Sequence, residues 1–260
     1  MSNHASGASD NRAYYIYGIV PADVEPAPDA SGVGDPPAKI ELIRHDKIAA
    51  LVSEIDVSKP LGRPEDLMAH QRLLDAAVAE IPVLPLRFGA VMTGPEAVTG
   101  ELLAPAHDEF AAALSELEGR AEYVVRGRYE QDAILREVLS EDRDAASLRE
   151  QIRAVGDEDA TREQRIQLGE LINEAVSVKR EADTRALGDA LAPHCVASKV
   201  REPTHEEDAA NIAVLAESGK QAGLEQAIGD LARDWEGRVE LRVLGPMAPY
   251  DFVVTAAPEA

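Results

Sequence analysis

The pattern of apolar and polar positions predicts a β-rich beginning to the chain. The run A-Y-Y-I-Y-G-I-V at residues 13–20 is apolar on both faces and rich in β-branched and aromatic side chains, which is typical of a central strand. Two further apolar runs at residues 40–43 and 48–55 predict a hairpin. The intervening residues 21–37 contain five prolines and predict a surface loop.

A helix is predicted over residues 64–80, because apolar side chains recur there at helical spacing and Pro64 suits a first helical position. The proline-punctuated residues 83–88 then predict a short buried strand. A second helix is expected from Pro95 to about residue 118, with Pro105 breaking it near its start. The expected buried stripe of the first helix consists of Leu67, His70, Leu74, Ala77, Val78 and Ile81.

The second half of the chain predicts the element order β-α-β-β-α-β, which is the split βαβ pattern of ferredoxin-like domains. A long charged region, residues 130–194, fills the first crossover and includes a helical arm at about 130–160. Thr161 with Gln164, and Ser218 with Gln221, have the spacing of capping boxes at two helix starts. The four strands are expected at residues 121–129, 195–201, 211–217 and 238–244.

The predicted fold class is α+β, with two domains between two tails. Residues 1–12 are polar and lack the basic and apolar regions of a signal peptide, so they are expected to form a disordered tail. Residues 13–119 form the N-terminal α+β domain. Residues 120–245 form the ferredoxin-like domain with its helical insertion. A C-terminal tail, residues 246–260, follows.

Charge narrows the classes of partner. The chain has 48 acidic and 26 basic residues, a formal net charge of −22. Such a surface repels phosphate backbones and anionic lipids, so neither a nucleic acid nor a membrane is an expected partner. No apolar run is long enough to span a bilayer. Cys195 is the only cysteine, which fits a reducing compartment, and it is expected to be a small core residue.

Motifs for catalysis, metals and cofactors are missing from the sequence. It contains no C-x-x-C, H-E-x-x-H or G-x-S-x-G motif. The E-S-G-K run at residues 217–220 lacks the other positions of a phosphate-binding loop. We therefore expect no metal, cofactor, small-molecule substrate or catalytic residue. His70 is expected to be a hydrogen-bonded core group, and Arg87 to form a salt bridge from the sheet to a helix or an acidic side chain.

Three segments jointly resemble the gas vesicle accessory family GvpL/GvpF. They are the opening strand, the helix with His70 followed by V-L-P-L-R-F-G-A-V at residues 83–91, and G-P-M-A-P-Y-D-F-V at residues 245–253. The sequence departs from the family at Met247, where an aromatic residue is frequent. The residues that carry the signature or a possible interaction are His70, Pro85, Arg87, Phe88, Gly89, Gly245, Pro246, Pro249 and Tyr250.

The resemblance implies a minor structural or assembly protein of gas vesicles. Such a protein would bind the hydrophobic shell protein GvpA and other accessory proteins during vesicle nucleation and formation, at the vesicle within the cytoplasm, and would not be secreted. Residues 245–253 and the arm at 130–160 are both candidate contacts. Two alternatives remain: an interaction adaptor outside gas vesicles, or an enzyme that uses His70 and Arg87, which requires both side chains to open into a pocket.

Overall fold

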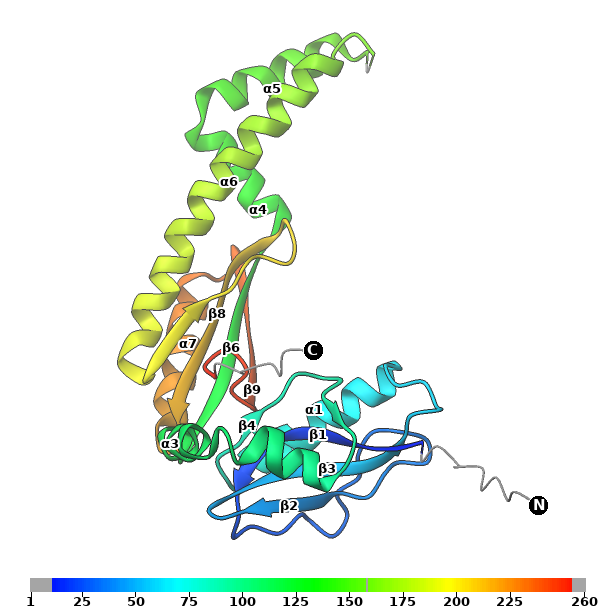
Figure 1. Ribbon diagram of the computed structural model, residues 1–260. Coiled ribbons are helices and arrows are strands. Elements are labelled where there is room, and N and C mark those ends of the chain that lie inside the picture. Colours follow the sequence, from blue (N-terminus) through cyan, green and yellow to red (C-terminus); the bar gives the residue numbers. More distant parts are fainter. Residues whose placement is uncertain (1–10, 158, 254–260) are drawn as a thin grey trace, which may run out of the picture. The chain divides into compact units, whose positions relative to one another are not determined.

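The structure, a computed structural model, describes residues 11–157 and 159–253 (Figure 1). It divides into unit 1, Met1–Glu122 with Gly245–Ala260, and unit 2, Tyr123–Leu244. Most of the expected N-terminal tail lies outside the described residues, but Arg12 already belongs to the first strand. The end of the chain groups with unit 1, whereas the sequence suggested a separate tail.

Unit 1 is built on an antiparallel sheet. Its strand β1 is internal, as predicted from the apolar residues on both faces of that strand. A register shift between Ile16 and Gly18 leaves Tyr15, Tyr17 and Val20 in one buried cluster. Gly18 permits the close approach of β4, because a Cβ there would lie 2.6 Å from the Leu84 carbonyl oxygen. The strands are β1 (Arg12–Pro21), β2 (Glu41–His45), β3 (Ile48–Asp56), β4 (Leu84–Pro85) and β5 (Val91–Met92), in the order β2-β3-β1-β4 with β5 also on β1.

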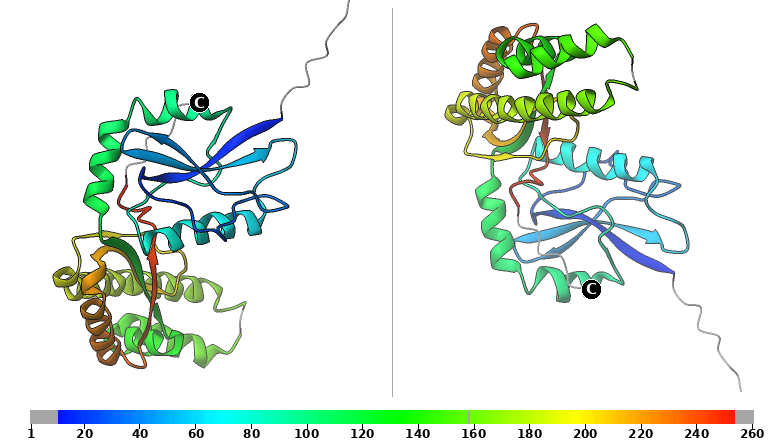
Figure 2. Two further views of the ribbon diagram at one scale, coloured as in Figure 1. Left: turned by 90° about the horizontal axis from the view of Figure 1, so that it is seen from below. Right: turned by 90° about the horizontal axis from the view of Figure 1, so that it is seen from above.

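Helices lie on both sides of this sheet, α1 on one side and the α2–α3 segment on the other (Figure 2). The expected break at Pro105 is confirmed, because it falls between η1 and α3. The strand expected at residues 83–88 shortens to β4, in which Pro85 lacks an amide donor for the ladder. The helical elements are α1 (Pro64–Val78), α2 (Pro95–Ala97), the π-helical turn η1 (Val98–Leu103) and α3 (His107–Leu117).

The buried face of α1 differs from the predicted stripe at its first turn. Leu67 is 52% exposed, and Asp66 is buried in its place. The Asp66 carboxylate accepts hydrogen bonds from the Gly34 amide at 3.0 Å and the Arg63 amide at 3.1 Å. These bonds fasten the proline-rich loop to the helix, which explains why a charged side chain occupies an inward position.

Unit 2 has a four-stranded sheet in the order β7-β8-β6-β9. Together with the helices between the strands, this gives the predicted β-α-β-β-α-β sequence of elements. In the last strand Val239 is buried, whereas Val243 is 40% exposed, because the strand lies at the edge of the sheet. The strands are β6 (Arg120–Tyr129), β7 (Ala197–Val200), β8 (Asp208–Glu217) and β9 (Val239–Met247).

The crossover from β6 to β7 forms the expected helical arm, in which α4 and α5 pack along α6 (Figure 1). Asp142 caps α5, and Gly156 ends it at a positive φ of 68°. None of the helices in the described part of the chain has the length and apolarity needed to cross a bilayer. The helical elements are α4 (Gln131–Glu141), α5 (Arg143–Val155), α6 (Arg162–Leu191), η2 (Ala192–His194), η3 (Ser218–Lys220) and α7 (Gln221–Asp234).

Three local expectations for unit 2 are wrong. The Thr161 hydroxyl donates to the Asp157 carbonyl at 2.7 Å instead of capping α6. Ser218 begins the 3₁₀ turn η3, so α7 starts at Gln221, two residues later than the capping box implied. Cys195 is half-buried, because it lies between η2 and the exposed edge strand β7 and not in the core.

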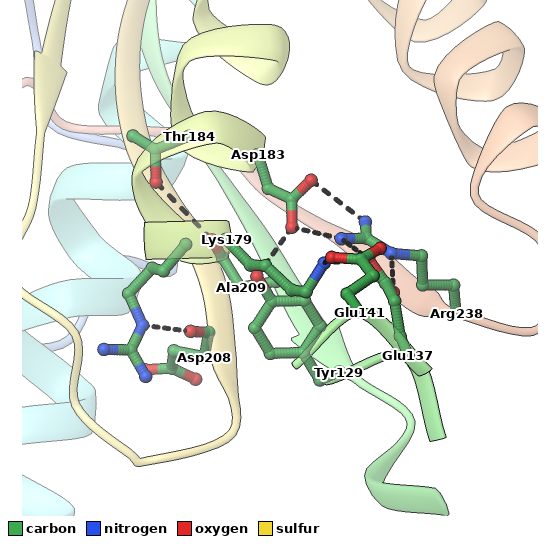
Figure 3. A network of polar contacts seen from close by, with 10 residues as sticks. Tyr129, Glu137, Glu141, Lys179, Asp183, Thr184, Asp208, Ala209 and Arg238 are labelled. Atoms are coloured by element: carbon green, nitrogen blue, oxygen red, sulfur yellow. Dashed lines mark hydrogen bonds and ion pairs between the residues drawn. The ribbon is translucent and has the colours of Figure 1, made fainter. Parts of the chain in front are cut away.

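A charged network joins the arm to the sheet of unit 2 (Figure 3). Arg238 donates to Asp183 of α6 at 2.9 Å and to Glu137 of α4 at 2.7 Å. Lys179 contacts Glu137 at 2.6 Å, and the Tyr129 hydroxyl donates to Asp183 at 2.6 Å. Burial alone would lower the pKa of Arg238, but the hydrogen bonds that it donates to both carboxylates raise this pKa overall. The arm is therefore tied to the sheet by paired charges that stay ionised.

Replacing this arginine tests the network. We expect Arg238→Met to lower the free energy of unfolding of unit 2 by about 3 kcal/mol, because the Asp183 carboxylate loses its cation and Glu137 keeps only Lys179. Urea unfolding followed by the fluorescence of Trp235, the only tryptophan, reports on this unit. The matched control is Arg242→Met, since the Arg242 side chain is 74% exposed in its pair with Glu240, and a loss below about 1 kcal/mol is expected. Equal losses in the two variants would contradict the role of the network.

Candidate functional site

Several signature residues converge on His70 in unit 1. β1 contributes Tyr15, the segment after β4 contributes Phe88 and Gly89, and the end of the chain contributes Tyr250. His70 lies on the buried face of α1 and is 2% exposed. Segments from both ends of the sequence thus meet at one imidazole ring. We call His70, Tyr15 and Tyr250 the histidine clamp.

Hydrogen bonds occupy both nitrogens of the His70 ring. The Tyr15 hydroxyl lies 2.9 Å from Nδ1, and the Tyr250 hydroxyl lies 2.8 Å from Nε2. The Gly89 amide donates to the Tyr15 oxygen at 3.2 Å. In a neutral imidazole one ring nitrogen donates and the other accepts, so one of the two tyrosine hydroxyls donates to the ring and the other accepts from it. The clamp is then a neutral chain of hydrogen bonds in which each group has a partner.

Aromatic rings enclose the imidazole. The centroids of Tyr17 and Phe88 lie 5.6 and 5.7 Å from that of His70. Burial lowers the pKa of His70 to about 4, with a backbone hydrogen bond at Leu86 acting in the opposite direction. Burial also raises the pKa of both clamp tyrosines. All three groups are uncharged at neutral pH, and the cluster is buried at His70 and Tyr15 but 38% exposed at Tyr250.

The end of the chain is fastened to unit 1 at two further points. The Ala248 amide donates to the Asp75 carboxylate of α1 at 3.0 Å, and the Asp251 amide donates to Glu122 at 2.9 Å. Ala248 is fully buried, and Glu122 is 2% exposed. These contacts explain why residues 245–253 group with unit 1 instead of trailing from the second domain. The predicted tail 246–260 is corrected for its described part, and residues 254–260 lie outside the described residues.

The remaining signature residues differ in their burial and in their distance from the histidine clamp. Gly89 has a positive φ of 94°, which few other residues adopt readily. Pro85 pairs with Gly18 in β4 and lines a small apolar cavity of about 220 Å³ with Phe252. Pro249 is buried beside Ala248. Gly245 and Pro246 are exposed near the end of β9.

The salt bridge expected at Arg87 is wrong. Its side chain is exposed, and within residues 11–157 and 159–253 it has no ion-pair partner. Leu86 is buried and Phe88 packs on His70, so the residue between them points the opposite way, toward solvent. The chain has also left the short strand β4 by that point. The prediction placed Arg87 within a longer strand, and this is why it failed.

The geometry does not support chemistry at His70. The ring is enclosed with both nitrogens engaged, and neither His70 nor Arg87 lines the four cavities of about 570, 780, 530 and 220 Å³. The enzyme alternative required both side chains to open into a pocket. In the described ranges, no group of three or more histidine, cysteine, aspartate or glutamate side chains could hold a metal ion.

Four residues of the site were not among the candidates expected from the sequence: Tyr15, Tyr17, Asp75 and Glu122. A signal for the two tyrosines was present, because Tyr15 and Tyr17 lie on one face of a strand that is apolar throughout. A buried tyrosine hydroxyl requires a hydrogen-bond partner. Tyr17 obtains one by donating to Ser53 at 3.1 Å. The two carboxylates bind backbone amides distant in sequence, and no local pattern indicates such a contact.

The low pKa of His70 predicts a pH dependence of stability. The unfolded-state pKa is about 6.5 and the folded-state pKa about 4. The folded state thus favours the neutral ring. The contribution of neutral His70 to the free energy of unfolding is therefore complete above about pH 6.5 and is lost as the pH falls toward 4. The loss is roughly 3 kcal/mol. Urea unfolding followed by circular dichroism should show a shallower decline over this range for His70→Gln than for the wild type. Identical pH profiles would contradict the assignment.

Removing one hydroxyl tests the contact with the end of the chain. Tyr250→Phe keeps the ring but leaves the buried His70 Nε2 without its partner, and we expect a loss of about 1–2 kcal/mol. Amide exchange at Ala248 and Asp251 should accelerate as well, because the segment is held less firmly. Tyr14→Phe is the matched control, since Tyr14 precedes Tyr15 in β1 and successive strand residues point to opposite faces, so its hydroxyl lies away from His70. Unchanged exchange in Tyr250→Phe would show that the clamp does not retain the segment.

Comparison with known proteins gives the same assignment throughout the chain. The family model described as "Gas vesicle synthesis protein GvpL/GvpF" matches residues 13–254. Gas vesicle protein F of Streptomyces sp. (strain CB03234) is 35% identical over 243 residues, which cover 92% of this chain and 98% of that protein. Gas vesicle protein L of the same strain is 30% identical over 131 residues, 45% of this chain and 48% of that protein.

Two solved structures share the fold. The crystal structure of the gas vesicle protein GvpF from Anabaena sp. PCC7120 has a TM-score of 0.76 at 24% identity, covering 92% of this chain and 96% of that one. The GvpF structure from Microcystis aeruginosa has a TM-score of 0.71 at 23% identity, covering 92% and 98%. With a family model over nearly the whole sequence and a relative at 35% identity, the chain belongs to the GvpL/GvpF family of gas vesicle synthesis proteins.

Proposed function

We propose that this chain acts in the assembly of gas vesicles in the cytoplasm, as an accessory protein that binds the hydrophobic shell protein GvpA. In this role it holds the shell protein in a dispersed form during nucleation and growth, together with other accessory proteins. The observation that carries the proposal is the 35% identity to a gas vesicle protein F over 92% of the chain. The same relationship argues against an adaptor outside gas vesicles.

The charge of the chain supports a dispersing role. A net charge of −22 keeps a complex soluble even when one partner contributes a large apolar surface. The binding surface itself must be apolar, because burial of apolar area is the main attraction available to a hydrophobic partner. The role requires no bond to be made or broken, and we therefore propose a non-enzymatic function.

Of the two contacts suggested by the sequence, the arm is the more available. Residues 245–253 use Ala248, Tyr250 and Asp251 to hold on to unit 1, so this segment is already engaged. The arm instead exposes apolar side chains near the loop between α5 and α6: Val155 is 53% exposed and Ile166 is 55% exposed. A truncation of residues 245–260 would expose the core of unit 1, and would confuse loss of binding with loss of folding.

Deletion of the gene from a gas vesicle cluster expressed in a heterologous host tests the proposal. We expect few or no vesicles by electron microscopy and a larger aggregated fraction of shell protein. The wild-type gene and the surface variant Arg242→Met should both restore vesicles. Affinity capture of the tagged full-length chain should recover the shell protein. Normal vesicle number in the deletion strain, with no shell protein captured, would overturn the proposal.

A further inference from the structure

Unit 1 has an apolar hollow of about 570 Å³ beside α1, which we call the α1 groove. Its floor includes Val20 and Leu51 of the sheet, and its walls are α1 and the proline-rich loop. On α1 the apolar part of the wall consists of Ala69, Leu73, Ala76 and Ala77, one helical stripe beside the buried face that carries His70. The family signature does not include this groove.

The groove is preformed, because its loop wall is fixed at several points. The Val33 amide donates to the Tyr17 hydroxyl at 2.8 Å, and the Gly34 amide donates to Asp66. Gly32 packs so closely that a Cβ there would lie 2.0 Å from the Tyr17 hydroxyl oxygen. Arg44 binds the carbonyl oxygens of Ala22 and Val24 at the start of the loop. A ligand would therefore meet an existing cavity and would not need to order the loop.

The charged residues around the groove indicate which charge a bound ligand would carry. Asp29, Glu65 and Glu80 are exposed acidic residues among the groove lining, and Arg72 is the basic residue among them. Two other acids of the lining are already compensated, Glu25 by Arg44 and Asp66 by Arg63. A basic occupant complements this rim, whereas a second copy of this chain, with its own charge of −22, is repelled.

The walls of the groove favour a helical occupant over an extended one. β1 and β3 are internal strands, so neither offers a free edge for strand addition. The loop side is rich in prolines such as Pro26 and Pro37, which lack an amide donor for a ladder. On the opposite side, the alanines of α1 permit the close approach of a second helix.

We propose that the α1 groove binds an amphipathic basic helix of a partner protein. The apolar stripe of that helix lies against Leu73 and the alanines of α1, and its lysine or arginine side chains face Asp29, Glu65 and Glu80. This inference deepens the proposed function by giving a surface for a partner, but its test requires no gas vesicle protein. Its failure would leave the deletion experiment unaffected.

Binding of a synthetic helix to the full-length chain tests the inference. The probe is a fluorescein-labelled peptide of about 14 residues, four helical turns, with leucine at helical spacing and lysine elsewhere. Two companion peptides replace the lysines by glutamate, or the leucines by serine. Fluorescence anisotropy should show saturable binding of the leucine–lysine peptide alone. Equal binding of the leucine–glutamate or serine–lysine peptide would overturn the proposal.

Matched charge reversals locate the site. Asp29→Lys combined with Glu80→Lys should weaken binding of the leucine–lysine peptide at least about tenfold, because both charges lie at the rim. Glu170→Lys combined with Glu174→Lys makes the same change in net charge on exposed positions of α6, and should weaken it less than about twofold. Ala76→Phe, which occupies the groove from an exposed position, should reduce binding without altering charge. Equal effects of the two double variants, or full binding by Ala76→Phe, would refute the site.

Discussion

Unit 1 depends on a buried imidazole that needs a partner for each of its nitrogens. An unpaired polar atom at this depth would cost about 1–3 kcal/mol, so the fold must bring a hydroxyl to each side of the ring. One comes from the first strand and the other from residue 250, near the end of the chain. The glycine amide that completes the chain of bonds comes from the segment after β4. A single requirement for hydrogen bonding thus joins four stretches of sequence.

The main polar clusters of the two units differ in charge. The cluster at His70 in unit 1 consists of neutral groups, and the pKa shifts of the histidine and the tyrosines all favour the uncharged forms. Unit 2 relies on paired ions, with Arg238 shared between carboxylates of two helices. Acid weakens the first arrangement by charging the histidine, and it weakens the second by neutralising the carboxylates. Salt has little effect on the hydrogen bonds between the neutral groups of unit 1, and it screens the partly exposed ion pairs of unit 2 more strongly.

The elements that could be predicted from the sequence are those with a regular period. The central strand, the helix over His70 and the β-α-β-β-α-β order follow from apolar spacing, which local sequence carries. Asp66 in place of Leu67 could not be predicted, because its partner is a loop amide more than thirty residues away. The signature residues were found by resemblance, yet Arg87 was misplaced because the strand is shorter than its apolar run. The attachment of residues 245–253 depends on backbone amides, which every residue except proline carries and no pattern marks.

The return of residues 245–253 to unit 1 has a consequence for synthesis of the chain on the ribosome. Unit 2, Tyr123–Leu244, is inserted within the sequence of unit 1. The ribosome must therefore translate all of unit 2 before Tyr250 exists, a delay on the order of ten seconds at bacterial elongation rates. During that interval His70 lacks one of its two partners, and the surface later covered by Ala248 is open. The inserted unit can fold first, while the unit that begins the chain is completed last.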